Sequence, residues 1–308
     1  FPTPPPPPPI LSGLVGSEMC IRDRFKDSIH ANFSFSADLN LPAVGSVEDL
    51  LGQARVLSQS VDGIHVSDGP YAGVHFPALA AAQLLLEQNI DPVLQLSCRD
   101  KNRSTLEIEI RGALALGVTS LLLVRGESAG ISDTSDRIVK VSTTDLIRMV
   151  RRVEEESQSA NLSVGTIATV FKPVADWRPD ALLKKTQAGA NFIRTQLCFD
   201  AEKLRAYLPN LVSSKITWKA PVVVNLAVLP SAKAAKWLSE NLRGSLIPEK
   251  VIKRMEDAVD PEAEGVQVAA ELIAEFNEIP GVSGVCLMTP GPPELIPEAV
   301  RASGVRQV

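Results

Sequence analysis

The chain has 308 residues, of which 45% are hydrophobic and 22% charged, and its formal net charge at pH 7 is -5. This composition is typical of a globular protein, and the negative charge argues against a nucleic-acid partner, because such partners select a basic face. Every apolar run is shorter than the roughly 20 residues of a membrane-spanning helix, so no membrane partner is expected.

A proline-rich leader opens the chain. Residues 1–24 contain a proline run that can form a polyproline II helix but buries no core, and they lack the basic and apolar regions of a signal peptide. We expect this segment to be a disordered tail or read-through from a sequencing adapter, with no part in fold or function. The folded domain is expected over residues 25–308.

Short apolar runs then alternate with amphipathic segments, the pattern of a parallel sheet with helical crossovers. Strands are predicted at 32–37, 63–67, 92–97, 120–124, 163–170, 192–195, 222–227 and 284–288. Helices are predicted at 47–59, 77–88, 104–116, 144–155, 179–187, 201–207, 232–241, 248–258 and 261–278. Eight βα units, with no GxGxxG motif after the first strand, favour a single-domain (β/α)8 TIM barrel over an open doubly wound sheet.

Polar residues gather where the predicted strands end, which is where a barrel of this kind builds its active site. The first strand ends at Asp38 and the fourth at Arg125, Gly126 and Glu127. Two carboxyl groups would therefore share one partly buried mouth, which favours a protonated form suited to general-acid work. The other strand ends carry Ser67, Asp68, Cys98 to Arg103, Thr169, Lys172, Thr195, Gln196 and Thr289.

Basic residues and a glycine add to this rim. Arg125 and Lys185 would balance the carboxylates or hold a phosphate, and Gly126 would let the backbone approach a flat ligand. The run RDKNR at 99–103 has a second interpretation, as a structural network of salt bridges and helix capping.

The sequence predicts no metal site. Its four cysteines are too far apart for a CxxC pair, and its three histidines fit no zinc pattern such as HExxH. Widely spaced cysteines in a chain of this size are expected to be buried thiols in a reducing cytoplasm.

Several motifs together resemble one enzyme family. They are LQLSCRDKNR (94–103), GALALGVTSLLLVRGE (112–127), KKTQAGANFIRTQLCFD (184–200), IPEKVIKRM (247–255) and GVSGVCLMTPG (281–291). In these segments, and from about Phe33 to Val305 overall, the chain is similar to the methylenetetrahydrofolate reductases, particularly to their short, catalytic-barrel form.

The resemblance implies an oxidoreductase that uses a flavin. Members pass hydride from NADH or NADPH to bound FAD, and then to the methylene carbon of 5,10-methylenetetrahydrofolate, giving 5-methyltetrahydrofolate. Protonation of N10 makes that carbon electrophilic, so an acid is needed beside the folate. The expected partner is a small tetrahydrofolate derivative. The sequence leaves open the choice between NADH and NADPH, the oligomeric state (a homo-oligomer included), and whether the product serves methionine biosynthesis, methyl-group catabolism or carbon fixation.

The family's functional residues carry over to numbered positions. Asp38 stands where the family has its catalytic glutamate, and is one methylene shorter, whereas Glu127 replaces a catalytic aspartate near the flavin. Gln196 matches a glutamine that hydrogen-bonds the pterin, and Thr195 and Glu127 are expected to bind the substrate beside it. The cofactor-binding residues implied in this way are Ser67, Gln95, Arg125, Gly126, Glu127 and Lys185.

Other functions stay open at this point. The loop 170–177 departs from the family pattern, which allows a flavin-free reductase that takes hydride directly from NADH. The shortened acid at Asp38 allows a barrel that binds folate or a protein partner without catalysis. The colour of the purified protein separates the first alternative from a flavoprotein.

Overall fold

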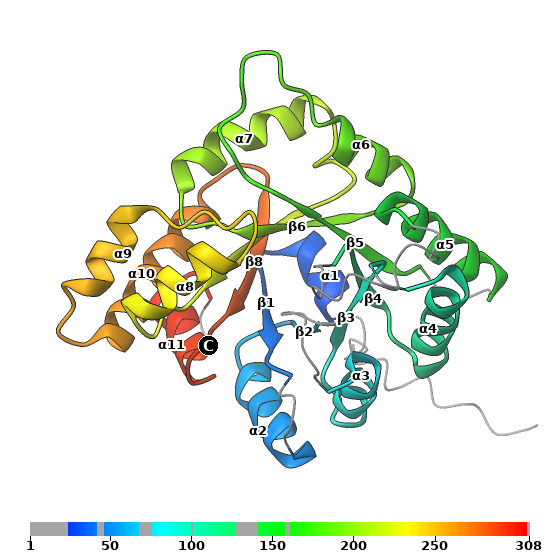
Figure 1. The fold of residues 1–308 in the computed structure, drawn as a ribbon, viewed down its shortest axis with the longest axis horizontal. Coiled ribbons are helices and arrows are strands. Elements are labelled where there is room, and N and C mark those ends of the chain that lie inside the picture. Colours follow the sequence, from blue (N-terminus) through cyan, green and yellow to red (C-terminus); the bar gives the residue numbers. More distant parts are fainter. Residues whose placement is uncertain are drawn as a thin grey trace, which may run out of the picture.

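A closed barrel forms the centre of the protein. The computed structural model describes residues 24–41, 46–67, 76–99, 101–126, 141–157 and 161–306. Eight parallel strands pair in chain order and β8 pairs with β1, which confirms the predicted single-domain (β/α)8 barrel (Figure 1). The strands are β1 (Ser34–Leu39), β2 (Gly63–Val66), β3 (Pro92–Ser97), β4 (Ser120–Val124), β5 (Ser163–Ala168), β6 (Phe192–Leu197), β7 (Val222–Ala227) and β8 (Val282–Met288).

Helices surround the barrel and largely match the predicted segments. They are α2 (Val47–Ser58), α3 (Ala78–Glu87), α4 (Arg103–Leu116), α5 (Thr143–Glu156), α6 (Asp180–Gln187), α7 (Ala201–Ser213), α8 (Ala232–Asn241), α9 (Glu249–Glu256) and α10 (Pro261–Asn277). Helix α7 continues well beyond its predicted end at 207, through Pro209. Two further helices, α1 (Arg24–Ala31) and α11 (Leu295–Ala302), are absent from the prediction.

Local signals in the sequence explain several helix boundaries. The Ser46 side chain accepts a hydrogen bond from the backbone N–H of Asp49 at 3.0 Å, and the Asp49 carboxylate accepts one from the Ser46 N–H at 3.3 Å. This capping box satisfies donors that the first turn of α2 leaves without helical partners. Gly117 ends α4 with φ of 86°, a left-handed conformation that favours glycine.

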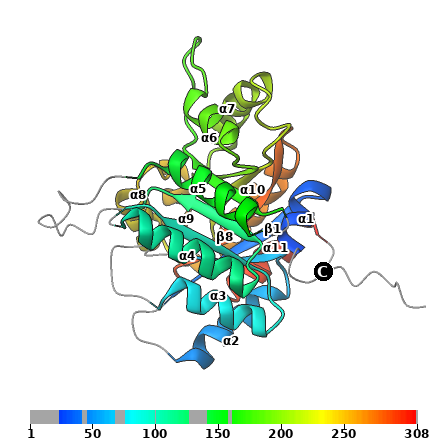
Figure 2. The ribbon, with the colours of Figure 1, turned by 90° about the vertical axis from the view of Figure 1, so that its right-hand side faces the viewer.

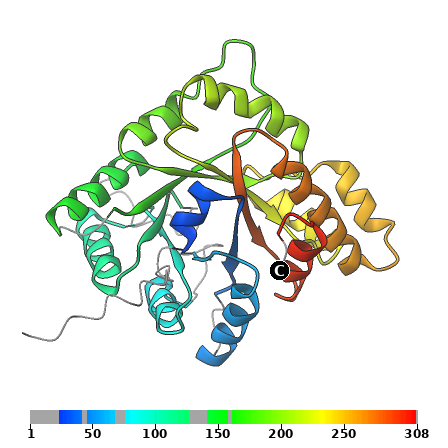
Figure 3. The same cartoon turned by 180° about the vertical axis from the view of Figure 1, so that it is seen from behind.

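Helix α1 closes the amino-terminal end of the barrel. Figure 2 shows it beyond one end of the strands, and Figure 3 shows it in front of the barrel centre. The Phe25 side chain is fully buried and contacts the ring of Phe192 at 5.4 Å between centroids, in an edge-to-face arrangement. Phe25 belongs to an interior apolar cluster with Val93, Leu122 and Val223, whereas a larger cluster fills the space between strands and helices. Arg24, placed in the leader by the sequence, is the first residue of this helix.

Two buried carboxylates hold α1 in place. Asp91 accepts a hydrogen bond from the Phe25 N–H at 2.9 Å. Asp62 accepts bonds from the Ser28 hydroxyl at 2.7 Å and from Arg306 Nη2 at 2.6 Å, so it joins α1 to the end of the described chain. These groups lie at the end of the barrel opposite the carboxyl ends of the strands, and we assign them a structural role.

Among the helices described, none combines the length and the apolar character needed to span a bilayer.

Candidate functional site

The carboxyl ends of the eight parallel strands meet at one mouth of the barrel, and most of the predicted site residues lie there. Ser67 follows β2, and Arg125 and Gly126 follow β4. Gln95 and Gln196 lie in the carboxyl-terminal halves of β3 and β6. Ser67 is buried, Gln95, Gly126 and Gln196 are half-buried, and Arg125 is exposed. Glu127, Asp68, Asp100 and the leader at 1–23 lie outside the described residues.

Asp38 occupies the interior side of β1 near this mouth, and its partner is an arginine from the far side of the barrel. Both Asp38 carboxylate oxygens accept hydrogen bonds from the Arg194 guanidinium of β6, from Nη1 at 2.7 Å and from Nη2 at 2.8 Å. The two side chains are 15% and 7% exposed. Such a bidentate pair fixes the plane of the carboxylate as well as its charge.

A layer of polar side chains lies on the interior side of the strands next to this pair. Arg194 Nη1 is 3.2 Å from His65 Nδ1, and His65 Nε2 is 3.2 Å from the Ser36 hydroxyl. Burial, and then the charge of Arg194, lower the pKa of His65 well below its usual value, so the imidazole is neutral. When the Asn225 amide is oriented to satisfy both neighbours, it accepts from Arg194 Nη2 at 3.3 Å and donates to the Cys286 carbonyl at 3.0 Å.

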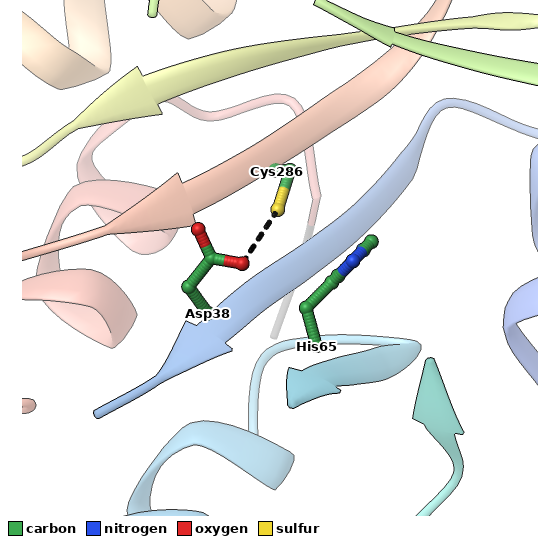
Figure 4. Close-up of side chains that lie close together, drawn as sticks. All are labelled: Asp38, His65 and Cys286. Atoms are coloured by element: carbon green, nitrogen blue, oxygen red, sulfur yellow. Dashed lines mark hydrogen bonds between the residues drawn. The ribbon is translucent and has the colours of Figure 1, made fainter. Parts of the chain in front are cut away.

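Three of these residues have the composition of a metal site. Asp38, His65 and Cys286 point toward one another from β1, β2 and β8, and their ligand atoms all lie within 4.8 Å of one another (Figure 4). The Cys286 thiol donates a weak hydrogen bond to Asp38 Oδ1 at 3.9 Å, and burial chiefly raises the pKa of this thiol to about 12. Since Arg194 already contacts both Asp38 and His65, its guanidinium supplies the positive charge that a metal ion would bring.

A second group of residues lies at the ends of β3, β4 and β5. Lys185 of α6 donates a hydrogen bond to the Ile167 carbonyl at 3.1 Å, and burial lowers its pKa. Burial raises the pKa of the neighbouring Cys98 thiol, which donates to the Arg125 carbonyl at 3.8 Å. The Cys98 thiol is therefore neutral beside two basic residues, Lys185 and Arg125, whose positive charges suit a phosphate.

At the end of β4, Gly126 leaves the backbone without a covering side chain. Its φ is 82°, and a Cβ atom added there would lie 2.9 Å from the Cβ of Ser97. Only glycine fits this position without strain. With the basic residues beside it, this backbone fits the requirements of a flat cofactor that carries phosphates, although the contacts of Glu127 with such a group stay a prediction.

Gln196 packs against a loop that follows α8. Leu246 donates to the Leu197 carbonyl at 2.8 Å and accepts from the Phe199 N–H at 2.8 Å, so this loop adds a short parallel bridge beside β6. Gly244 in the loop has φ of 79°, and a Cβ there would be 3.3 Å from Gln196 Cγ. The loop thus forms a wall beside Gln196, the predicted pterin-binding residue. The sequence analysis does not predict this wall.

Thr195 lies differently from its neighbour Gln196. The register of β6 and β7 shifts between Arg194 and Leu197, and the Thr195 hydroxyl lies in this irregularity. It donates to the Gln196 carbonyl at 2.7 Å and accepts from the Asn225 N–H at 3.0 Å, and Thr195 is 1% exposed. The expected contact of Thr195 with substrate stays a prediction, while its observed bonds stabilise the irregular strand pair.

The run at 99–103 agrees with its structural interpretation in the residues described. Lys101 forms an ion pair with Glu109 at 2.8 Å, and the Asn102 side chain caps α4 by accepting from the Thr105 N–H at 2.8 Å. Both contacts stabilise the start of α4.

The loop that departs from the family pattern packs outward. Phe171 and Trp177 contact each other at 4.9 Å between ring centroids, and both contact Tyr207 of α7, at 5.5 and 5.3 Å. In Figure 2 this loop extends above α6 and α7, away from the barrel. Its aromatic residues therefore anchor it to a helix.

Comparisons with known proteins identify the family of the chain. Residues 24–304 match the family model described as methylenetetrahydrofolate reductase. A curated relative in Caenorhabditis elegans, "Probable methylenetetrahydrofolate reductase (NADPH)", is 24% identical over 178 residues, which cover 57% of this chain and 26% of the relative. The chain thus spans about a quarter of that relative's length.

A solved structure shares the fold. It is a Clostridium thermocellum protein described as binding two copies of 5-methyl-5,6,7,8-tetrahydrofolic acid. The TM-score is 0.60 at 13% sequence identity, and the match covers 91% of this chain and 97% of that chain.

Proposed function

Since the chain belongs to the methylenetetrahydrofolate reductase family of oxidoreductases, we propose that it reduces 5,10-methylenetetrahydrofolate to 5-methyltetrahydrofolate with NADH or NADPH. The observation that carries this proposal is the Asp38 carboxyl group, which lies at the barrel mouth at the end of β1 and is 15% exposed. A carboxyl group there is accessible to a small substrate and is held rigidly enough to act on one atom of it.

Asp38 is the acid in this proposal. It delivers a proton to N10 of the folate, the bond between N10 and the bridging carbon breaks, and the carbon remains on N5 as an electrophilic iminium group. Gln196 hydrogen-bonds the pterin and orients it. The wall at Gly244 limits where the Gln196 side chain can lie, because a methyl group added at Gly244 would lie only 3.3 Å from Gln196 Cγ.

The residues at the ends of β3 to β5 would hold FAD. Lys185 and Arg125 would contact its phosphates, Gly126 would let the ring system approach the backbone, and Ser67, Gln95 and Glu127 would complete the site. When bound, the flavin would supply the hydride-transfer chemistry between the nicotinamide and the folate. The protein residues supply binding, orientation and the proton.

The comparisons support the substrate class. The curated relative carries the family's name together with NADPH, and the Clostridium thermocellum protein of the same fold binds the product of this reaction.

A spectrum and a turnover assay test the proposal. The purified protein should show a visible flavin absorption band that bleaches with NADH or NADPH in the absence of oxygen and returns when 5,10-methylenetetrahydrofolate is added, with 5-methyltetrahydrofolate as the product. A colourless protein that still turns over with NADH would identify the flavin-free reductase. A folded protein that binds 5-methyltetrahydrofolate without turnover would identify a non-catalytic barrel, and either result contradicts the flavin-dependent reaction.

A further inference from the structure

Arg194 is the most highly connected charged residue inside the barrel. Its Nη1 donates to Asp38 and lies 3.2 Å from His65, and its Nη2 donates to Asp38 and reaches Asn225. Arg194 is 6% exposed and lies two residues before Gln196 in β6. None of the family motifs assigns it a role, and the proposed reaction does not yet use it.

The histidine beside Arg194 has a defined protonation. An arginine can only donate hydrogen bonds, so the His65 Nδ1 atom that faces Nη1 must be the acceptor. The ring proton is then on Nε2, which donates to the Ser36 hydroxyl at 3.2 Å. Ser36, His65 and Arg194 thus form a chain of hydrogen bonds that fixes the guanidinium in the plane of the Asp38 carboxylate.

This chain determines the position of the Asp38 carboxyl group before substrate binds. The carboxyl oxygens face the Arg194 guanidinium from β6, the Cys286 thiol from β8 and the neutral His65 ring from β2. Among these neighbours, the Arg194 guanidinium contacts both carboxylate oxygens, so it sets the plane in which they lie.

We propose that Arg194 is a positioning residue for the folate half-reaction: it orients Asp38 toward the mouth, stabilises the carboxylate that remains after proton transfer, and affects catalysis only through Asp38. This inference rests on the proposed function. In the full step, the Asp38 carboxylate takes a proton from a hydronium ion of the solvent, which leaves as water, and the Asp38 O–H bond then breaks as the N10–H bond forms. The electron pair of the bond between N10 and the bridging carbon moves to N10, the N5 lone pair forms the iminium bond, and the Asp38 carboxylate returns to Arg194.

A double-mutant cycle tests this dependence. The native protein, Asp38→Asn, Arg194→Met and the double variant are compared in two assays, namely NAD(P)H oxidation with an artificial electron acceptor and reduction of 5,10-methylenetetrahydrofolate. We expect Arg194→Met to slow folate reduction roughly 10²-fold, because misplacement of a catalytic group by about an ångström has that effect. The double variant should be no slower than Asp38→Asn, and NAD(P)H oxidation should stay near the native rate in all of them.

Two further variants separate positioning from folding. Arg194→Lys keeps the charge but loses the fork that binds both carboxylate oxygens, so its folate rate should lie between those of native and Arg194→Met. If Arg194→Met does not fold, the comparison is made with Arg194→Lys instead. Arg151 is a matched control, because its guanidinium is also partly buried and bonds to Gly189, Leu162 and Glu154 outside the mouth. Arg151→Met should lower the melting temperature without separating the two rates.

The inference would be overturned if the loss of folate reduction in the double variant equalled the product of the losses in the two single variants. Equal losses of folate reduction and NAD(P)H oxidation in the Arg194 variants would also overturn it. These results differ from a native protein that reduces no folate, which would overturn the proposed function together with the inference.

Discussion

The Arg194 guanidinium of β6 and the Asp38 carboxylate of β1 meet across the barrel interior at 2.7 and 2.8 Å. The two strands are not neighbours in the sheet, so the pair joins opposite walls of the barrel just below its mouth. The acid of the proposed reaction is therefore held in place from inside the barrel, and its position depends on Arg194, which the proposed reaction does not bring into contact with the substrate.

Protonation of His65 should destabilise the fold. Its pKa is lowered by burial and by Arg194, so below the ordinary value of 6.5 the unfolded chain binds a proton that the folded protein does not. The free energy of unfolding should therefore fall by about 1.4 kcal/mol per pH unit as the pH drops below that value, until the folded pKa is reached. Urea unfolding between pH 7.5 and 5 measures this slope.

Two variants identify the histidine responsible. His65→Asn should remove this part of the slope while lowering stability at neutral pH, whereas His30→Gln, at an exposed position on α1, should keep it. If the native protein and His65→Asn have the same pH dependence, His65 is not the group that titrates.

Gly126 should be required for flavin retention. Gly126→Ala places a methyl group 2.9 Å from Ser97 at a φ of 82°, which costs about 1–2 kcal/mol of backbone strain and displaces the end of β4. The variant should lose FAD on dialysis, as fluorescence of the released flavin would show. Gly304→Ala, with φ of 67° and no neighbouring atom within 4 Å, has the same strain far from the mouth and should keep its flavin. Full retention by Gly126→Ala would argue against cofactor binding at this rim.

Substitution of Gly244 should weaken the binding of the folate and leave the binding of the nicotinamide unchanged. Gly244→Ala pushes against Gln196, so it should raise the KM for 5,10-methylenetetrahydrofolate while the KM for the nicotinamide stays unchanged. The matched control is Gly281→Ala, which also has positive φ but meets its nearest atom at 3.7 Å, in an ordinary contact. A change in both KM values, or in neither, would show that this wall does not border the folate.

The α1 helix should be essential for stability. Phe25→Ala removes a fully buried ring from the closed end of the barrel and should lower the free energy of unfolding by about 3–5 kcal/mol. A chain that begins at Arg24 should be as stable as the full chain, whereas one that begins at Lys26 should show the same loss as Phe25→Ala. Thermal unfolding of these four proteins compares them, and equal melting temperatures would contradict the role given to Phe25.

Local sequence patterns predict most of the barrel. Strands such as β3, β4 and β7 have their predicted bounds because each is a short apolar run between turn residues, and this pattern depends on neighbours in the chain. Helix α1 is not predicted because it is short and follows the leader, and because its stability comes from Phe25 and Ile29, which are buried by strands far along the sequence.

The residues of the candidate site can be predicted from the sequence, but their contacts with one another cannot. Asp38 and Gln196 are predictable, because strand ends define the mouth. The Asp38–Arg194 pair depends on barrel closure and strand register, which no local pattern specifies. One signal was available: Arg194 is a charge inside the predicted strand 192–195, and a buried charge requires a partner. Nothing in the sequence indicates that the loop around Gly244 returns to Gln196.

The most direct test of the account is a stopped-flow comparison of native protein and Asp38→Asn in both half-reactions. The variant keeps the shape of the side chain but holds no transferable proton, so folate reduction should fall roughly 10²-fold or more while reduction of the flavin by NAD(P)H continues at the native rate. Asp38→Glu, which restores the length of the family's acid, should keep or raise the folate rate. Equal losses in the two half-reactions, or no loss in either, would contradict the assignment of Asp38 as the acid.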